Sequence, residues 1–208
     1  MRKKTFFFIV FEGVEGTGKS YQINKLFHKL KKKKIDIIKT REPGGSTTAE
    51  KIRNLIFSKN SNHFDKLTDF YLMCAARNEH VRKTLLVARK KKQIVICDRF
   101  IDSTYAYQVI GNNIDKNINL LNQKYILKNL KPNLTIVLKS NLKIIFSRIK
   151  KRKKTNKFDR LKANFYKKVQ NTYINKASEN KNYFVFDSSK NNSDLEKKIF
   201  KLVIKKIK

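Results

Sequence analysis

The chain has 208 residues, of which 40% are hydrophobic and 11% aromatic, a composition that excludes a disordered segment and allows one domain with a sizeable core. Its 50 Lys and Arg outnumber 16 Asp and Glu, and the formal net charge of +34 can indicate a nucleic-acid partner. Because 40 of these 50 residues are Lys, spread along the whole chain, we interpret the charge as a compositional bias toward solvated lysines and expect no nucleic-acid partner.

Five short apolar runs, rich in β-branched and aromatic residues, predict β-strands at residues 5–11, 35–40, 94–97, 134–138 and 183–186. Amphipathic stretches between them predict helices at residues 18–34, 47–57, 66–91, 118–130, 142–152, 164–177 and 194–207. This alternation predicts an α/β fold with a doubly wound, five-stranded parallel sheet flanked by helices. The sequence has neither an internal repeat nor a Pro/Gly-rich linker, so we expect a single domain over residues 1–208.

Targeting and redox features of the sequence are few. Residues 1–10 combine a basic start with an apolar run, as a signal peptide does, but the run leads directly into a glycine motif, so we expect a first strand there. No run of 18 apolar residues occurs, and we therefore expect no membrane span. Cys74 and Cys97 lie in apolar surroundings without ligand spacing, which predicts buried free thiols and a reducing, cytoplasmic location.

The strongest motif follows the first predicted strand and opens the first predicted helix. It matches the pattern G-x-x-x-x-G-K-[ST] and comprises Gly13, Val14, Glu15, Gly16, Thr17, Gly18, Lys19 and Ser20. Its glycines let backbone N–H groups curl around phosphate oxygens, and the helix N-terminus adds the positive end of a dipole. We expect Lys19 to bridge the β- and γ-phosphates of ATP, and Ser20 to ligate Mg²⁺.

A second acidic element lies at the end of the third predicted strand. Asp98 ends the apolar run and is a candidate second ligand on the Mg²⁺ side. Arg99 follows directly, which would place a guanidinium at the carboxyl ends of the strands, where doubly wound sheets bind ligands. Seven of the ten arginines lie in sequence motifs, and where Lys is the default cation an Arg indicates a need for its planar, two-pronged donor.

Segments along nearly the whole chain resemble, in order, the motifs of bacterial thymidylate kinases. The matching segments are residues 11–20 (FEGVEGTGKS), 40–45 (TREPGG), 75–77 (AAR), 98–108 (DRFIDSTYAYQ), 131–135 (KPNLT) and 159–160 (DR). The resemblance implies a P-loop NTPase fold of the nucleoside-monophosphate-kinase type. It also implies transfer of the γ-phosphoryl group of ATP to dTMP with Mg²⁺, a role in dTTP synthesis, and a homodimer.

The resemblance implies roles for matching residues around the acceptor. Glu15 is similar to the acid that meets the 3′-hydroxyl of the substrate sugar, and Tyr107 to the tyrosine packed where a ribose 2′-hydroxyl would lie. The expected cations around the acceptor phosphate are Arg41, Arg53 and Arg99; the expected thymine wall is Met73, Arg77, Ser103, Thr104 and Gln108. The peptide bond before Pro43 can be cis in such loops.

Three departures from the family pattern concern the site. Met73 stands where an aromatic residue usually stacks on thymine; methionine can pack against a ring edge, and Phe70 lies one turn earlier. Asn133 replaces the usual Asp, and Lys139 stands where the following strand usually carries an Asp. Residues 161–163 (LKA) replace the acidic residues that usually follow the DR motif, so contacts made there in the family are not carried over.

Catalysis by such an enzyme needs no general base. The acceptor is a phosphate oxygen that is already ionised at pH 7, so the rate depends on positioning and charge neutralisation. Lys19 and Arg99 are the first candidates to supply the positive charge. Some thymidylate kinases carry a further catalytic arginine at the position of Gly16, and this chain has no cation among residues 14–17.

The remaining source of charge is a basic stretch, which we call the lid, near residues 148–160. Among its cations Arg152 is the first candidate for a catalytic residue, followed by Arg148 and Lys153. Arg148 is spaced one helical turn before Arg152, which predicts that both lie on one helix face.

Other functions are compatible with parts of the sequence. A kinase for another monophosphate, such as dUMP, stays open because Met73 could relax base choice. A deoxynucleoside kinase shares the P-loop and a basic lid, but it needs a carboxylate base and typically shows an E-R-S element, whereas residues 98–100 read DRF. A non-enzymatic nucleotide- or nucleic-acid-binding protein would fit the charge, but the intact Lys19 and Ser20 argue against it.

Overall fold

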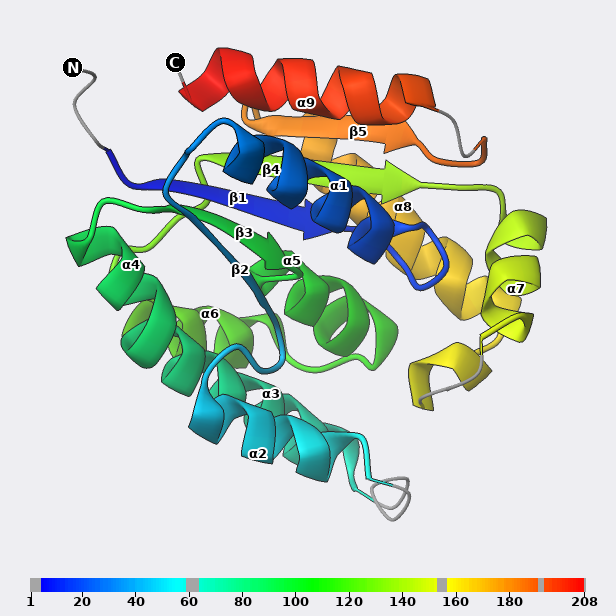
Figure 1. Cartoon of the computed structure of the whole chain (residues 1–208). Coiled ribbons are helices and arrows are strands. Elements are labelled where there is room, and N and C mark those ends of the chain that lie inside the picture. The colour runs from blue at the N-terminus through cyan, green and yellow to red at the C-terminus, as the bar shows by residue number, and fades with distance from the viewer. Residues whose placement is uncertain (1–4, 59–63, 153–156, 191–192, 208) are drawn as a thin grey trace.

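The computed structural model describes residues 5–58, 64–152, 157–190 and 193–207 (Figure 1). Within them, five strands form one sheet in the order β2-β3-β1-β4-β5, and every neighbouring pair is parallel. The strands are β1 (Phe7–Glu12), β2 (Ile37–Arg41), β3 (Ile94–Asp98), β4 (Leu134–Lys139) and β5 (Tyr183–Asp187). The predicted five-stranded parallel sheet is therefore confirmed, and the carboxyl ends of all five strands lie at the same end of the sheet.

Helices connect the strands and cover both faces of the sheet. The α-helices are α1 (Lys19–Lys32), α2 (Thr47–Ile56), α3 (Lys66–His80), α4 (Leu86–Lys90), α5 (Ile101–Thr104), α6 (Lys116–Leu127), α7 (Leu142–Lys150), α8 (Ala163–Ser178) and α9 (Ser193–Ile207). Two π-helical segments, η2 (Val81–Leu85) and η3 (Tyr105–Gly111), continue α3 and α5, and η4 (Lys157–Arg160) is a 3₁₀ turn.

Two predictions about helices need correction. No helix was predicted over residues 101–111, where α5 and η3 form; the segment (IDSTYAYQVIG) has Asp, Ser and Thr at its start, which compete for backbone hydrogen bonds and hide the helical period. The helix predicted at residues 142–152 ends at Lys150, so Arg152 lies beyond it. The prediction that Arg148 and Arg152 share one helix face is therefore wrong.

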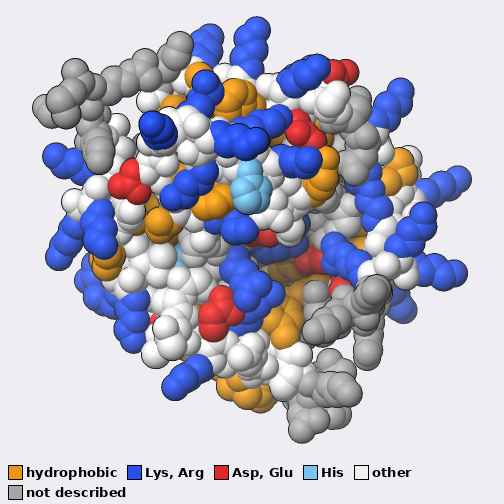
Figure 2. Space-filling model, in the orientation of Figure 1, with side chains coloured by type: hydrophobic (Ala, Val, Ile, Leu, Met, Phe, Trp, Pro, Cys, Tyr) orange, Lys and Arg blue, Asp and Glu red, His pale blue; other side chains and the backbone are white. Residues whose placement is uncertain are grey.

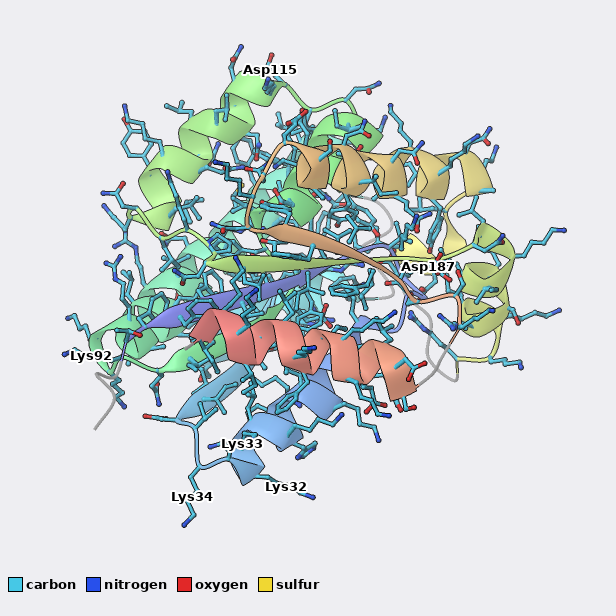
Figure 3. The ribbon with its side chains drawn as sticks, turned by 90° about the horizontal axis from the view of Figure 1, so that it is seen from above. Lys32, Lys33, Lys34, Lys92, Asp115 and Asp187 are labelled. Carbon is cyan, nitrogen blue, oxygen red and sulfur yellow. The ribbon has the colours of Figure 1, made fainter. Side chains whose placement is uncertain are left out.

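The two faces of the sheet have separate hydrophobic cores, because successive side chains of a strand point to opposite sides. Ile9 and Phe11 of β1 pack with α1 and α9, whereas Phe8 and Val10 pack with α3, η2 and α4. Figure 3 shows the sheet nearly edge-on, with α1 and α9 on one side and α6 and α8 on the other. This layering fixes the loops after β1, β2 and β3 beside one another.

Local hydrogen bonds fix where several elements begin. The side chain of Ser46 accepts from the Ala49 N–H (3.3 Å) and caps α2, and that of Asn141 accepts from the Lys143 N–H (2.8 Å) and caps α7. Asn133, one of the departures from the family pattern, accepts from the Phe8 N–H (2.7 Å) and so ties the start of β4 to β1. In contrast, the N-cap of α1 is Gly18, which offers no side-chain cap and leaves the first N–H groups of the helix open to an anion.

The surface carries basic charge on many sides. Figure 2 shows Lys and Arg side chains spread over the whole visible face rather than gathered in one patch. Figure 3 shows Lys32, Lys33, Lys34 and Lys92 at the end of the molecule where the strands begin, away from the carboxyl ends. Cys74 and Cys97 are buried and free, as predicted. No helix in the described ranges is long and apolar enough to cross a membrane.

Candidate active site

A cavity of about 300 Å³ opens at the carboxyl ends of β1, β2 and β3. The loop after β1, the start of α1 and residues of α3, η3 and η4 line it. All ten residues predicted to bind the acceptor line this cavity: Glu15, Arg41, Arg53, Met73, Arg77, Arg99, Ser103, Thr104, Tyr107 and Gln108. Sequence motifs separated by more than 90 residues thus meet in one space, as the parallel topology requires.

The loop between β1 and α1 curls tightly at one end of the cavity. Gly13 and Gly16 adopt positive φ values of 137° and 78°, and a Cβ at Gly13 would lie 2.3 Å from the Leu138 carbonyl oxygen. The Lys19 Nζ donates to the carbonyl oxygens of Gly13 (2.8 Å) and Val14 (3.0 Å). Burial, and then the charge of Arg99, lowers the pKa of Lys19 to about 8.

The predicted loop residues divide into two groups. Glu15, Gly16, Gly18, Lys19 and Ser20 line the cavity, whereas Gly13, Val14 and Thr17 support the loop from below. The Thr17 hydroxyl, for example, donates to the Val14 carbonyl (2.8 Å). The loop therefore presents N–H groups and one ammonium group to the cavity, which is the donor set that a chain of phosphates requires.

The two predicted metal ligands are adjacent. The Ser20 hydroxyl donates to Asp98 Oδ2 at 3.2 Å, and Asp98 Oδ1 is buried without a hydrogen-bond partner. A buried carboxylate oxygen without a partner, next to a hydroxyl and a phosphate loop, fits a hard divalent cation. Among the described residues no group of three or more His, Cys, Asp or Glu side chains is arranged to hold a metal ion.

Arg99 is held at the centre of the cavity by several partners. Its Nη2 donates to Glu15 Oε1 (2.7 Å), and its Nη1 donates to Ser103 Oγ (3.1 Å) and Tyr173 Oη (3.2 Å). The Tyr107 hydroxyl donates to the other oxygen of Glu15. Although burial alone would raise the pKa of Glu15, the charges of Arg99 and Lys19 lower it overall. Glu15 is therefore a carboxylate at neutral pH.

A second buried carboxylate lies beneath this network. Glu12, at the end of β1, accepts from the Phe100 N–H (2.8 Å) and from Ser103 Oγ (2.7 Å). Burial, and then the charge of Asp102, raises the pKa of Glu12 to about 7. Because Ser103 also bonds Arg99, Glu12 helps to fix that guanidinium from below.

The wall predicted to meet the base is held by Glu42. Arg77 Nε donates to Glu42 Oε2 (2.7 Å), its Nη2 donates to the Phe100 carbonyl (3.0 Å), and His80 Nδ1 lies 2.9 Å from Glu42 Oε1. The Glu42–Pro43 peptide bond is cis. Sequence reasoning did not place Glu42 in the site; its position between two predicted motif residues, Arg41 and Pro43, was the available signal.

The other predicted cations differ in where they point. Arg41 forms an ion pair with Glu50 (2.8 Å), and Arg53 Nη1 donates to the Pro43 carbonyl (2.7 Å). Arg152 lines the cavity and pairs with Asp159 (3.1 Å). Arg148 is absent from the cavity lining: its guanidinium donates to the carbonyl oxygens of Gly16 (3.3 Å), Ser188 (2.9 Å) and Ser189 (3.2 Å). Lys153 lies outside the described residues.

Sequence reasoning missed several further residues that line or support the cavity. Phe57, Phe100 and Phe158 line it, and Tyr173 supports Arg99 from α8. Phe100 was visible in the DRF segment, but no local pattern links residues 57, 158 and 173, which only the folded chain brings to one place.

The fold and this site define a class of protein. The site lies at the carboxyl ends of the strands of a parallel sheet. It combines a phosphate loop, an adjacent hydroxyl–carboxylate pair and an acceptor wall lined by arginines, and these are the parts of a P-loop kinase. A family model described as thymidylate kinase matches residues 11–199. The chain therefore belongs to the thymidylate kinase family.

Individual relatives agree with this assignment. The chain is 39% identical over 205 residues to a thymidylate kinase of Aster yellows witches'-broom phytoplasma (strain AYWB), covering 97% of this chain and 96% of the relative. It is 35% identical over 208 residues to a thymidylate kinase of Mycoplasma capricolum, covering 97% and 96%. The crystal structure of thymidylate kinase from Ehrlichia chaffeensis matches with a TM-score of 0.76 and 28% identity, over 98% of this chain and 100% of that one.

Proposed function

We propose that this protein is a thymidylate kinase that transfers the γ-phosphoryl group of ATP to dTMP, giving dTDP and ADP in dTTP synthesis. The observation that carries the proposal is that one cavity joins the phosphate loop to the wall formed by Arg99, Glu15 and Tyr107. The donor and acceptor phosphates can therefore be bound next to each other in one cavity, which is what direct phosphoryl transfer requires.

On the donor side, the loop N–H groups and the open N-terminus of α1 hold the phosphates, and Lys19 moves from its loop carbonyls to the β- and γ-phosphates. Ser20 and Asp98 would hold Mg²⁺, which neutralises phosphate charge when it is bound. The support for this is the partnerless Asp98 Oδ1 beside the Ser20 hydroxyl.

On the acceptor side, Arg99 binds the dTMP phosphate, together with Arg41 and Arg53, which line the same cavity. Glu15 accepts a hydrogen bond from the 3′-hydroxyl. Tyr107, only 5% exposed and bonded to Glu15, fills the space that a ribose 2′-hydroxyl would need, which favours deoxyribose. Arg77 and Gln108 offer polar contacts to thymine, and Ser103, Thr104 and Met73, which also line the cavity, complete the wall.

No residue of the chain acts as a general base, because the attacking phosphate oxygen is already ionised. The chain's own contribution is to align the two phosphates and to place positive charge where the transferred group develops negative charge. Arg99 and Lys19 supply it from within the cavity.

We also propose a single domain whose basic lid, residues 148–160, supplies further charge. Arg152 is the catalytic candidate there because it lines the cavity and pairs with the carboxylate of Asp159, which a phosphate could replace. For Arg148 a positioning role fits better, since its guanidinium joins the Gly16 carbonyl to the 188–189 loop.

The test is a coupled ADP-release assay in which dTMP, dUMP, thymidine and dGMP are offered in turn with ATP and Mg²⁺. The proposal requires dTMP to give the highest kcat/KM. A preference for thymidine would indicate a deoxynucleoside kinase, and equal use of dUMP would indicate a broader pyrimidine monophosphate kinase. Chelation by EDTA should abolish turnover if Mg²⁺ is required, and restoration by added Mg²⁺ completes that arm.

A binding protein without activity is the alternative that the charge would favour. Binding to single-stranded DNA should collapse as salt rises if it is non-specific, because neutralised phosphates release counterions. Turnover of dTMP should survive the same salt range. A protein that binds single-stranded DNA tightly in high salt and releases no ADP with dTMP would overturn the kinase proposal.

We further propose a cytoplasmic homodimer. The support is a set of exposed apolar side chains on three helices of which α3 packs against both others: Leu55 at α2, Leu67 and Tyr71 on α3, and Leu120, Leu121 and Tyr125 on α6. Sedimentation equilibrium of the wild type and of a Tyr125→Lys/Leu121→Lys double variant tests it. A wild-type monomer at micromolar concentration contradicts the proposal.

A further inference from the structure

Three aromatic rings form a chain across the outer side of the cavity. The ring centroids of Phe57 and Phe158 lie 5.9 Å apart with an interplanar angle of 73°, and those of Phe158 and Tyr107 lie 5.3 Å apart at 76°. Both are edge-to-face contacts. Phe57 ends α2, Phe158 belongs to η4, and Tyr107 belongs to η3, so three distant segments contribute one ring each.

Phe158 is held in this position from two sides. Its backbone carbonyl accepts from the Tyr166 hydroxyl of α8 (2.9 Å), and its ring packs on Tyr107, whose hydroxyl bonds Glu15. Phe158 and Phe57 both line the cavity while keeping part of their surface exposed. The Arg53 guanidinium lies 4.7 Å from the ring centroid of Phe57. Of the three rings, Phe57 is therefore the one in contact with a cation expected at the acceptor phosphate.

On the wall around Arg77 the aromatic residue is Phe100, whose side chain is only 1% exposed and packs in the hydrophobic core. Met73 lines the cavity where the family pattern has an aromatic residue, and its neighbours there, Arg77 and Gln108, are polar. Phe70, considered from the sequence as a substitute one turn earlier, has no exposed surface and packs in the core under the sheet. Among the described residues, α3 therefore brings no aromatic side chain to the cavity.

We propose that Phe158, supported by Phe57, supplies the aromatic contact to the acceptor base, so that thymine packs against a ring of η4 rather than one of α3. The inference rests on the proposed function and names the base-contacting residue of the same site. In the proposed function Tyr107 meets the sugar, and the Phe158 ring packs on Tyr107 within the same cavity, so a base attached to that sugar comes within reach of the Phe158 ring. Met73 and Arg77 line the same cavity and would complete the surroundings of thymine.

The decisive variant is Phe158→Leu, which keeps the apolar character and removes the ring. We expect the KM and Kd for dTMP to rise roughly three- to tenfold, as loss of one ring–ring contact predicts, with the KM for ATP unchanged. Phe57→Leu should give a smaller rise, and the double variant should add little to Phe158→Leu, because Phe57 acts through Phe158.

Phe165→Leu is the matched control. The Phe165 ring also packs on Tyr107, at 6.0 Å and 56°, but it comes from α8 and is not part of the cavity lining. Like Phe158→Leu, the Phe165→Leu variant takes away a phenyl ring that packs on Tyr107. It therefore measures how much the dTMP KM rises when only the packing around Tyr107 is loosened. An equal rise in the dTMP KM for Phe165→Leu and Phe158→Leu would overturn the proposal, as would a Phe158→Leu variant whose dTMP KM stays within twofold of wild type.

A base-free acceptor separates base contact from sugar contact. The inhibition constant of 2-deoxyribose 5-phosphate against dTMP should be unchanged in Phe158→Leu, because that molecule has nothing to pack on the ring. If it weakens as much as dTMP does, Phe158 acts on the sugar or the phosphate and the proposal is wrong. Wild-type turnover of dTMP in the same series reports on the proposed function, so the two failures can be told apart.

The chain also offers a direct binding reporter, because it contains no Trp. Phe158→Trp places a single indole at the proposed contact while keeping an aromatic surface. Its emission should change on addition of dTMP and not of 2-deoxyribose 5-phosphate, and the change should saturate at the kinetic Kd. Identical emission with and without saturating dTMP would contradict a ring–base contact.

Discussion

Arg99 and Arg152 both line the cavity but are held in different ways. We call the part with Lys19, Met73 and Arg99 the inner wall, and the part with Phe57, Arg152 and Phe158 the rim. On the inner wall, Arg99 is 15% exposed and bonds Glu15, Ser103 and Tyr173. On the rim, the Arg152 side chain is 39% exposed and forms an ion pair with Asp159, whose side chain is 1% exposed. Breaking a buried ion pair is costly, whereas an exposed guanidinium is free to take another partner in solvent. The orientation of Arg99 is therefore set by several buried partners, and that of Arg152 by a half-exposed pair with a buried carboxylate.

In the proposed function, this difference divides the positive charge that compensates the transferred phosphoryl group between a fixed arginine and a movable one. A group held before substrate arrives stabilises the developing charge without reorganisation, which is the more effective arrangement. A group on the rim can instead exchange a carboxylate for a phosphate as the reaction proceeds. We expect inner-wall variants to alter both binding and chemistry, and rim variants to alter the chemical step.

The largest expected effect is on the inner wall, at Lys19. Lys19→Ala should lower kcat by a factor of roughly 10²–10⁴, because a charge aimed at the transferred phosphoryl group is lost. Steady-state kinetics with saturating ATP and dTMP measure it, and circular dichroism confirms that the variant is folded. Turnover within threefold of wild type would remove Lys19 from the catalytic set.

The second prediction concerns how the inner wall depends on pH. Burial, then Asp102, raises the pKa of Glu12 from the usual 4.5 to about 7, which corresponds to about 3 kcal/mol of differential interaction. Between these two pH values the folded state binds more protons than the unfolded state, so the unfolding free energy falls as pH rises through this range. The penalty is complete above pH 7 and absent below pH 4.5.

Glu12→Gln removes this titration, so its unfolding free energy should fall less than that of wild type between pH 5 and pH 8. Urea denaturation at unit steps of pH measures both proteins. The groups whose pKa values are lowered, such as Glu15 and Glu42, act in a more acidic range and do not enter the comparison. Parallel pH profiles for the two proteins would show that Glu12 ionises freely in the folded state.

On the rim, Arg152→Ala should slow single-turnover phosphoryl transfer by roughly 10²-fold or more. Lys151→Ala is the matched control, since Lys151 is an exposed neighbour outside the cavity lining. Arg148→Ala should instead perturb ATP binding, because it frees the Gly16 carbonyl. If all three variants behave alike, the rim covers the site without supplying charge.

A smaller loss is expected when the charge of the inner wall is kept and only its shape changes. Arg99→Lys should cost at least about 2 kcal/mol in kcat/KM for dTMP, because a point charge cannot replace a two-pronged donor. The KM for ATP should change far less. A variant with weaker ATP binding and an unchanged dTMP KM would mean that Arg99 faces the donor phosphate.

The sequence was sufficient for the parts of the inner wall that lie in contiguous motifs. Residues 13–20 and 98–108 each read as one chemical unit, and the alternation of strands and helices predicted that their ends meet. The roles of individual side chains stay predictions. Helix α5 with η3 escaped prediction because its polar residues face the cavity, which removes the amphipathic period.

The rim was harder to predict because its side chains are brought together by contacts between segments that are distant in the sequence. Phe57 and Phe158 are 101 positions apart and lie in no motif, so their contact follows only from the packing of η4 against α2. The end of α7 at Lys150 likewise moved Arg152 off the helix face on which its spacing had placed it. The hydrophobic period of a sequence locates a helix. Where the helix ends depends on the hydrogen bonds that the residues after it form, which the period does not reveal.

The smallest expected effect asks which side of the cavity meets the face of the base. Met73 is 8% exposed and lines the same cavity as the rings of Phe57 and Phe158. Met73→Phe would add a second aromatic surface there, so dTMP binding should tighten by about 0.5–1.5 kcal/mol if the new ring stacks on thymine. The dTMP Kd, measured by calorimetry, tests it, and Met73→Leu controls for the change of apolar shape. An unchanged or weaker dTMP Kd would mean that this wall is built around methionine, which leaves ring recognition to the rim alone.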